Sequence, residues 1–219
     1  MGVITNMMLI ILLAIAAFGL IHSLLAGQRV KQWASRRFGR RAYEGFYRLA
    51  YNVLAALTIL PVIALVALRP GAVVWQVDTP LLRLLLNGLR LAGAAGLGLS
   101  LIQIDLGRFA GLSQALAYFR GEPLPLPPEP LQTRGLYRFV RHPLYFFSLL
   151  ALWPAPTMTE TLLAFNIGAT LYFIIGSRYE ERRMLASYGD AYRRYQKQVP
   201  WLLPRFRRAN SENTHQLLV

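Results

Sequence analysis

The feature that most constrains this chain is a long apolar run at its start. Val3–Ala26 contains no charged side chain. A helix crosses the hydrocarbon core of a bilayer with about 20 apolar residues, so the run is long enough to span a membrane. It is also longer than the core of a signal peptide, which has about 7–15 residues, and no basic residue precedes it. We therefore expect a retained transmembrane helix.

Two further runs have the same character. Phe46–Leu68 is charged only near its start, at Arg48. Leu81–Leu106 carries charges towards both ends, but residues 91–104 have none. Small residues in this stretch allow helix backbones to approach closely; they are Gly93, Ala94, Ala95, Gly96, Gly98 and Ser100. The sequence therefore predicts a second and a third transmembrane helix.

Prolines divide the last apolar segment. Leu144–Trp153 is apolar, Pro154-Ala155-Pro156 interrupts the run, and Thr161–Gly176 is apolar again. Two short runs joined by a proline turn predict a helical hairpin over residues 142–178. The sequence thus predicts an all-α, polytopic membrane protein with five transmembrane helices, the last two forming the hairpin.

The basic residues predict the orientation of these helices. Connections 27–48, 107–141 and 178–208 carry seven, five and nine Lys or Arg residues, and those on the other side carry none, three and none. Because basic loops stay in the cytoplasm, we expect the N-terminus outside and the C-terminus inside, in a bacterial inner membrane. After Tyr179, the apolar spacing predicts a cytoplasmic amphipathic helix, interrupted at Gly189 and ended before Pro200.

Composition excludes several other classes of protein. Hydrophobic residues make up 55% of the chain and charged residues 16%, whereas a soluble domain has about 45–50% and about 25%. The absence of cysteine rules out a disulfide framework, thiolate metal sites and a cysteine nucleophile. Anionic lipid at one membrane face explains the formal net charge of +14. We expect no metal and no nucleic-acid partner.

Polar residues that can do chemistry gather on both sides of the hairpin. One group precedes it, with Tyr137, Arg141, His142 and Tyr145, and Glu180-Glu181 follows it. Since a hairpin returns the chain to the same membrane face, we expect the two groups to enclose one nucleotide-sized hollow. Ionisable groups near membrane depth are candidates for function. In the alternative interpretation, Arg141 contacts lipid phosphate and the glutamates neutralise nearby arginines.

The same two groups carry a family resemblance. GLYRFVRHPLY at 135–145 and EERRMLASYGDAYRRYQKQVPWLLP at 180–204 resemble the signature of the isoprenylcysteine carboxyl methyltransferase superfamily of membrane enzymes. Four earlier segments are similar to its methanethiol S-methyltransferase branch and NnrU-like relatives. They are HSLLAGQRVKQW at 22–33, YRLAYN at 47–52, PGAVVWQV at 70–77 and GLSQALAYFRGEPL at 111–124.

The resemblance implies a methyltransferase that uses S-adenosylmethionine, releases S-adenosylhomocysteine and methylates a small apolar thiol, converting methanethiol to dimethyl sulfide. It places eight residues at the methyl donor: Leu131, Thr133, Gly135, Tyr137, His142, Tyr145, Glu180 and Glu181. Arg141 would lie near the transferred methyl group. His142 or His22 would accept the proton of the thiol. A carboxylate suits the ammonium of this methyl donor, and aromatic faces suit its sulfonium.

The implied organisation is one integral membrane domain. Residues 1–106 form a three-helix part, residues 107–208 a cofactor-binding part, and residues 209–219 a disordered tail. Three readings of function stay open: a thiol acceptor, a carboxylate or lipid amine acceptor, and a non-catalytic membrane accessory protein. His22 has an alternative reading as a histidine bonded to nearby backbone or headgroup. The oligomeric state, and which glutamate meets the ammonium, stay open as well.

Overall fold

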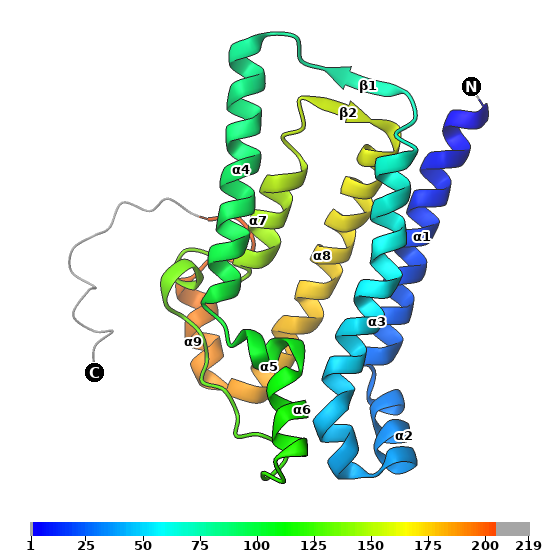
Figure 1. Cartoon of the computed structure of the whole chain (residues 1–219). Coiled ribbons are helices and arrows are strands. Elements are labelled where there is room, and N and C mark those ends of the chain that lie inside the picture. The colour runs from blue at the N-terminus through cyan, green and yellow to red at the C-terminus, as the bar shows by residue number, and fades with distance from the viewer. Residues whose placement is uncertain (1, 205–219) are drawn as a thin grey trace, which may run out of the picture.

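The computed structural model describes residues 2–204 and places the apolar runs in long helices (Figure 1). Four helices are long and apolar enough to cross a membrane: α1 (Gly2–Ala26), α3 (Arg40–Leu68), α4 (Pro80–Ile102) and α8 (Glu160–Tyr188). The prediction of a mainly helical integral membrane protein is therefore confirmed. The tail expected at residues 209–219 lies outside the described residues.

The other helices are short. They are α2 (Gln28–Phe38), α5 (Leu106–Ala110), α6 (Leu112–Phe119), the 3-10 helix η1 (Gly135–Arg138), α7 (Pro143–Leu152) and α9 (Asp190–Gln198). α7 stands where a fifth span is expected. Its ten residues rise about 15 Å, half of the about 30 Å of hydrocarbon in a bilayer. The count of five transmembrane helices is not confirmed and stays a prediction.

Small residues of α4 let α7 pack against it, as the sequence predicts. A β-carbon added at Gly93 would overlap the backbone of Ala151, and one added at Gly96 would overlap the ring of Phe147. Gly98 has no atom within 4 Å of such a β-carbon. Two of these glycines thus set the distance between α4 and α7, and the third does not.

The second arm of the hairpin is longer than expected. α8 runs unbroken for 29 residues and includes the charged segment from Arg178 to Tyr188. The amphipathic helix expected after Tyr179 does not begin there, since its first half continues α8 and only its second half is a helix of its own, α9. The charges end the apolar run but not the helix, because Arg and Glu are good helix formers. The predicted break at Gly189 is confirmed: its φ is 53°, and α9 then ends before Pro200.

The expectation of an all-α fold needs one correction. β1 (Val73–Gln76) pairs antiparallel with β2 (Thr157–Thr159), with Trp75 opposite Met158. The Trp75 indole also donates a hydrogen bond to the carbonyl of Ala155, at 3.2 Å. β-branched and aromatic residues favour strands, but a strand of three or four residues leaves too short a pattern to predict from sequence.

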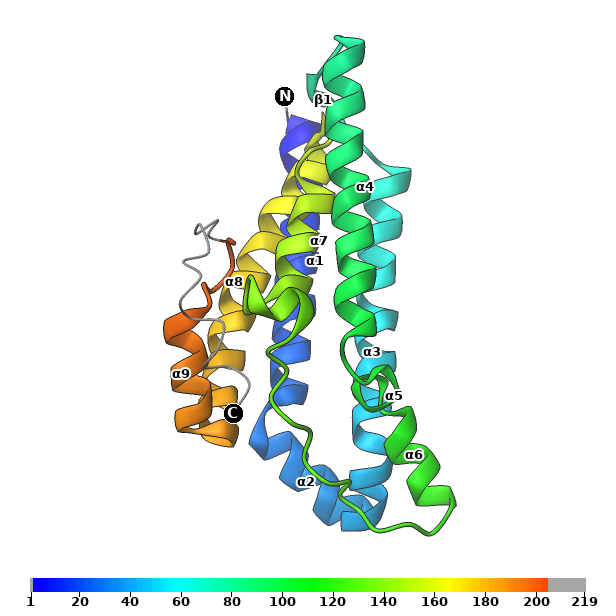
Figure 2. The same cartoon turned by 90° about the vertical axis from the view of Figure 1, so that its left-hand side faces the viewer.

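The helices form a bundle with two distinct ends (Figures 1 and 2). α1, α3 and α8 pack around a core that contains Ile11, Ile15, Val62 and Ala164. The β1–β2 ribbon caps one end, called here the ribbon end. α2, α6 and α9 lie towards the other, called the α2 end (Figure 1). Of the basic connections, residues 27–48 and the parts 107–120 and 178–198 lie in the half of the bundle towards the α2 end (Figure 1).

Candidate active site

The two polar groups that flank the hairpin meet in the structure. The backbone helps to join them, because the segment after α9 pairs with the start of α7. The amide of Arg141 donates to the carbonyl of Pro200 at 2.9 Å, and the amide of His142 donates to the carbonyl of Trp201 at 3.3 Å. The chain therefore brings residues 141–145 against the α2-end half of α8.

Glu181 is the centre of a buried hydrogen-bond network. Arg141 donates to its two carboxylate oxygens at 2.8 and 3.2 Å. The Nε2 of His142 lies 2.9 Å from Oε1, and the Tyr192 hydroxyl donates to the same oxygen at 2.9 Å. The Gln196 amide donates to Oε2. These five residues, called the Glu181 network, leave the Glu181 carboxylate without a free oxygen.

The Arg141 guanidinium donates hydrogen bonds to three residues. Besides Glu181, its Nη1 donates to the carbonyls of Gln196 and Val199, at 3.1 and 2.6 Å. The side chains of Arg141 and Glu181 are 11% and 12% exposed. A guanidinium committed in this way fixes the positions of its neighbours. Its contacts do not favour a place beside the transferred methyl group, and that expectation stays untested.

Glu180 is in a different situation from its neighbour. It accepts one hydrogen bond, from the Tyr145 hydroxyl at 2.8 Å, and its Oε2 lies 3.6 Å from the Nδ1 of His142. Its side chain is 28% exposed. The Tyr145 ring stacks between His142 and Phe173, with ring centroids 5.4 and 5.0 Å apart. Glu180 therefore has room to accept a further hydrogen bond.

The remaining predicted residues of the methyl-donor site lie along one segment. Leu131 packs against Tyr192 and Tyr195, and Thr133 is half-buried next to it. The Tyr195 hydroxyl donates to the carbonyl of Tyr137 at 2.5 Å. Burial, with a smaller effect from the Glu180 carboxylate, raises the pKa of Tyr137 to about 12, so its phenol is neutral at physiological pH.

Gln103 organises this segment and is not among the residues predicted for the site. Its Oε1 accepts from the amide of Leu136 at 2.8 Å, and its carbonyl accepts from the side chain of Gln132 at 2.6 Å. Gly135 has a φ of 61°, and a β-carbon there would overlap the Gln103 side chain. Only glycine fits this position, which explains the glycine that begins the GLYRFVRHPLY segment.

A cavity of about 520 Å³ opens at the α2 end of the bundle. Its wall comes from six helices and from the proline-rich segment at residues 121–130. The helices are α1, α2, α3, α5, α6 and α8. It is lined by Ala26, Lys31, Tyr43, Glu44, Tyr47, Arg48, Tyr51, Arg108, Gln114, residues 125–129, Arg183, Met184 and Tyr188. Arg183 and Met184 follow Glu180 by one turn of α8. The cavity therefore approaches the Glu180 carboxylate.

The segment 121–130, which contains five prolines, is extended and forms one wall of the cavity. No helix or strand occurs in residues 121–130. Side chains from three elements donate to its carbonyls: Arg41 to Glu122 at 3.1 Å, Arg108 to Pro127 at 2.6 Å and Tyr188 to Glu129 at 3.0 Å. Figure 2 shows this segment passing from α6 back towards α7.

His22 is connected to the cavity through Tyr51. The Tyr51 hydroxyl, which lines the cavity, is hydrogen-bonded to the Nε2 of His22. Phe18 stacks on His22, and Tyr172 packs edge-on against it, with ring centroids 5.4 and 6.0 Å apart. Within residues 2–204, the buried Nδ1 of His22 has no hydrogen-bond partner. Within the described residues the His22 ring bonds to a tyrosine and not to backbone, and the alternative of a lipid headgroup as partner stays a prediction.

The expected hollow needs a correction. Tyr137–Tyr145 and Glu180-Glu181 do come together, but they do so in direct hydrogen bonds. The cavity lies to one side of them, towards α2 and α3. The reason is that Arg141, His142 and Glu181 satisfy one another, so the charges that were expected to line a hollow close it instead.

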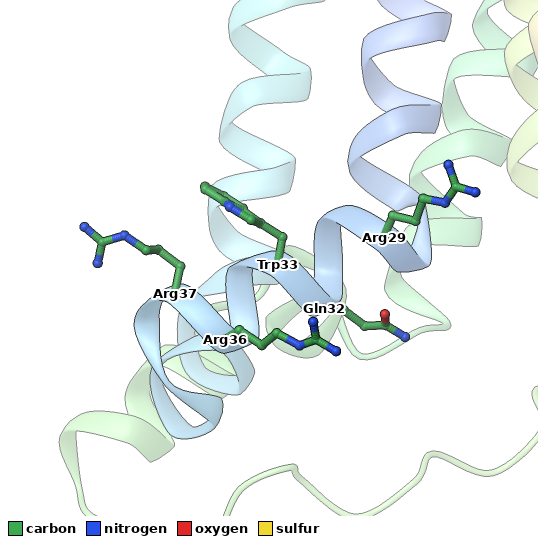
Figure 3. A pocket seen from close by; sticks show the side chains of 5 residues that line it. All are labelled: Arg29, Gln32, Trp33, Arg36 and Arg37. Carbon is green, nitrogen blue, oxygen red and sulfur yellow. The ribbon is translucent and has the colours of Figure 1, made fainter.

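A second hollow, of about 410 Å³, lies on the outer face of α2. Its five lining residues all come from that helix, as Figure 3 shows: Arg29, Gln32, Trp33, Arg36 and Arg37. At about 100° per residue, these side chains project from the opposite face of α2 to Lys31. This face is therefore separate from the cavity.

Comparison with known proteins identifies the family. The family model described as "Protein of unknown function (DUF1295)" matches residues 4–199. The chain belongs to the DUF1295 family. Methanethiol S-methyltransferase of Mycobacterium tuberculosis (strain ATCC 25618 / H37Rv) is 36% identical to it over 88% of the chain and 76% of the relative. Methanethiol S-methyltransferase of Pseudomonas deceptionensis is 33% identical over 92% of the chain and 74% of the relative.

Two other relatives widen this picture of the DUF1295 family. Methanethiol S-methyltransferase 1 of Bradyrhizobium diazoefficiens is 34% identical, and the chain covers 65% of its length. Nurim of Bos taurus is 29% identical over 69% of the chain and 58% of the relative. No solved structure gives a significant match. These relatives confirm the resemblance drawn from the sequence and the prediction of a methyltransferase enzyme.

Proposed function

We propose that this protein transfers a methyl group from S-adenosylmethionine to a small apolar thiol, with methanethiol as acceptor and dimethyl sulfide as product. The observation that carries the proposal is the position of Glu180, a partly exposed carboxylate beside stacked aromatic rings, one helical turn from residues that line a polar cavity. The relatives named methanethiol S-methyltransferase support the choice of acceptor.

The residues present fit such a methyl donor. The Glu180 carboxylate has capacity to accept further hydrogen bonds, which suits an ammonium group. The ring faces of Tyr145 and Tyr137 suit a sulfonium. Leu131, Thr133 and Gly135 form the segment beside them, held in shape by Gln103. The Glu181 network sets the positions of His142 and Arg141. We assign these two a positioning role, because both are already bonded to Glu181.

S-adenosylmethionine, when bound, supplies an electrophilic methyl group: the acceptor sulfur bonds to the methyl carbon, and the former carbon–sulfur bond breaks with its electron pair left on the donor sulfur. The protein contributes alignment and the exclusion of water, which would otherwise shield a thiolate. Phe18 and Tyr172 provide aromatic surfaces next to His22, and Phe173 packs against Tyr172. These surfaces suit a small apolar acceptor that arrives from the bilayer.

The proton of the thiol needs an acceptor, and we propose His22. In the tautomer whose Nε2–H donates to the Tyr51 hydroxyl, Nδ1 carries the lone pair and, without a partner among residues 2–204, is able to take a proton. The His142 ring is less suited, because Glu181 and Glu180 lie at its two nitrogens. In the proposal, the α2 end faces the cytoplasm, from which a polar methyl donor enters the cavity.

Headspace mass spectrometry tests this function. The purified chain, in lipid nanodiscs, receives methanethiol and S-adenosylmethionine with a deuterated methyl group. We expect dimethyl sulfide that carries one deuterated methyl group, and none from the Glu180→Ala variant. Binding of S-adenosylhomocysteine without any labelled dimethyl sulfide would rule out this acceptor and leave a carboxylate or amine acceptor. Failure to bind S-adenosylhomocysteine would rule out the methyl donor.

A further inference from the structure

The cavity is lined by more positive than negative side chains, and in the part of the chain that the structure describes three of these cations have no ion-pair partner. Lys31 of α2, Arg48 of α3 and Arg183 of α8 all line it. Within residues 2–204, none of the three has a carboxylate within ion-pair distance. Arg108 also lines the cavity, but it is bound to Asp105 and to the carbonyl of Pro127. Three free cations therefore face one hollow.

The charges are close enough to repel each other. Burial, followed by the charges of Arg183 and Arg48, lowers the pKa of Lys31 below its usual range. Lys31 and Arg183 are more than 150 residues apart in the sequence, so only the fold brings them to the same cavity. A protein that gathers like charges around a hollow lowers its own stability, unless an anionic ligand compensates when it binds.

The other side chains of the cavity indicate what kind of anion. Glu44 and Glu129 line the cavity as well, so it also offers carboxylates that can bind a positive group of the same ligand. Tyr43, Tyr47 and Tyr188 add aromatic surface, and residues 125–128 add apolar surface. A ligand that carries a carboxylate and an ammonium on a short chain, next to a larger ring system, matches this mixture.

We propose that Lys31, Arg48 and Arg183 form a subsite for the carboxylate of the amino-acid end of the methyl donor. The inference rests on the proposed function, since it takes S-adenosylmethionine as the donor. It gives a role to the segments 22–33 and 47–52, which lie outside the Glu181 network. It also explains how Arg141 and His142 can be committed to Glu181, because other cations bind the carboxylate.

Paired ligands separate this subsite from the rest of the site. S-adenosylhomocysteine has the amino-acid end, whereas 5′-deoxy-5′-methylthioadenosine lacks it. Calorimetry on the full chain in nanodiscs should show that Lys31→Gln and Arg48→Gln each weaken S-adenosylhomocysteine binding by about 10- to 100-fold, the size of a lost hydrogen bond to a charged group. Affinity for methylthioadenosine should not change.

Arg36→Gln is the matched control, because it removes one positive charge from the outer face of α2 (Figure 3). It should leave both affinities at the wild-type value. The proposal is overturned if Lys31→Gln and Arg48→Gln bind S-adenosylhomocysteine normally, or if they lose both ligands equally. If the wild-type chain binds neither ligand, the proposed function fails and not the subsite alone.

A second measurement needs no variant and so does not depend on variant folding. Lys31 and Lys197 are the two lysines of the chain, and Lys197 is exposed on α9. An amine-acylating reagent, read out by mass spectrometry, therefore reports both at once. S-adenosylhomocysteine should slow acylation of Lys31 several-fold without affecting Lys197, and methylthioadenosine should not. Equal protection of Lys31 by both ligands would contradict the subsite.

Discussion

Glu180 and Glu181 are neighbours in sequence, but the structure gives them different surroundings. Glu181 is bonded to four buried or half-buried side chains, whereas Glu180 accepts one hydrogen bond and is partly exposed. Removing one partner of a buried ion pair costs about 3–5 kcal/mol, because the other charge is left without compensation. Substituting the two carboxylates should therefore have different effects, one on stability and the other on ligand binding.

The first prediction compares Glu181→Gln with Glu180→Gln. Glu181→Gln should lower the free energy of unfolding by about 3–5 kcal/mol, since Arg141 loses its counter-charge. Glu180→Gln should change stability by less than about 1 kcal/mol and weaken S-adenosylhomocysteine binding. Thermal unfolding in detergent and calorimetry measure the two effects. Equal destabilisation by both variants would show that the distinction is wrong.

The second prediction concerns the pH dependence of Lys31. Nearby positive charge disfavours its ammonium form, so its pKa is lowered, and removing such a charge should raise it. The midpoint of Lys31 acylation against pH should lie below 10.5, the usual pKa of lysine, and should move upward in Arg183→Gln. Arg48 acts in the same direction, and Arg108, Glu44 and Glu129 are the other charged residues that line the cavity.

Arg182→Gln is the control for this experiment. Arg182 is next to Arg183 in α8 but lies outside the cavity lining, with its guanidinium over the ring of Tyr179. It should leave the midpoint of Lys31 where it is. An unchanged midpoint in Arg183→Gln would mean that the two charges do not interact.

At this scale, chemistry-bearing residues are easier to predict than the residues that hold them. Two adjacent carboxylates are conspicuous in a chain with ten acidic residues, and they do meet His142. Gln103 is not conspicuous, because an uncharged amide in a polar turn has no pattern of its own. The mutual bonding of Arg141 and Glu181 was equally hidden, since sequence gives the charges but not which of them pair.

At the scale of helices, close packing of α4 against α7 depends on glycine. The third prediction is that Gly93→Ala lowers the free energy of unfolding by about 1–3 kcal/mol, because the new methyl group overlaps the backbone of Ala151. Gly98→Ala is the matched control and should not destabilise the protein, since open space surrounds that position. Unfolding of the two variants in detergent compares them directly. Similar losses in both would mean that helix packing does not depend on Gly93.

Element boundaries show what hydropathy can and cannot predict. The apolar runs predict α1, the end of α3 and the start of α4 to within a residue, because burial in lipid needs about 20 residues without charge. α3, however, begins at Arg40, before the run that starts at Phe46, and α4 ends at Ile102, before the predicted Leu106. The end of α8 was missed, since the helix continues through Arg178–Tyr188 after its apolar part stops. The β1–β2 ribbon was missed because its partners are more than 80 residues apart in sequence.

For the whole molecule, the pattern of basic residues predicts that the α2 end of the bundle faces the cytoplasm. The fourth prediction uses the absence of cysteine, which makes single introduced cysteines easy to interpret. In intact cells, a membrane-impermeant maleimide should label Asp78→Cys at the ribbon end and should not label Gln32→Cys on α2 (Figure 3). After the cells are opened, both should react. The reverse pattern in intact cells would invert the proposed orientation.

The cavity belongs to the molecule as a whole and could not be derived from any one segment. Its wall is shared by six helices and an extended segment, so its charges come together only after folding. The sequence nevertheless marked several contributing segments through the family resemblance, among them 22–33 and 47–52. What it lacked was the relation between them: which residues close on each other and which leave space.

The central claim is that one methyl-donor site lies between Glu180 and the cavity at the α2 end. An experimental structure of the chain with S-adenosylhomocysteine bound tests it most directly. The ligand should lie with its sulfur next to Tyr145 and Glu180 and its carboxylate within ion-pair distance of Lys31 or Arg48. A ligand seated elsewhere, or one that reaches its position by breaking the Arg141–Glu181 pair, would contradict it.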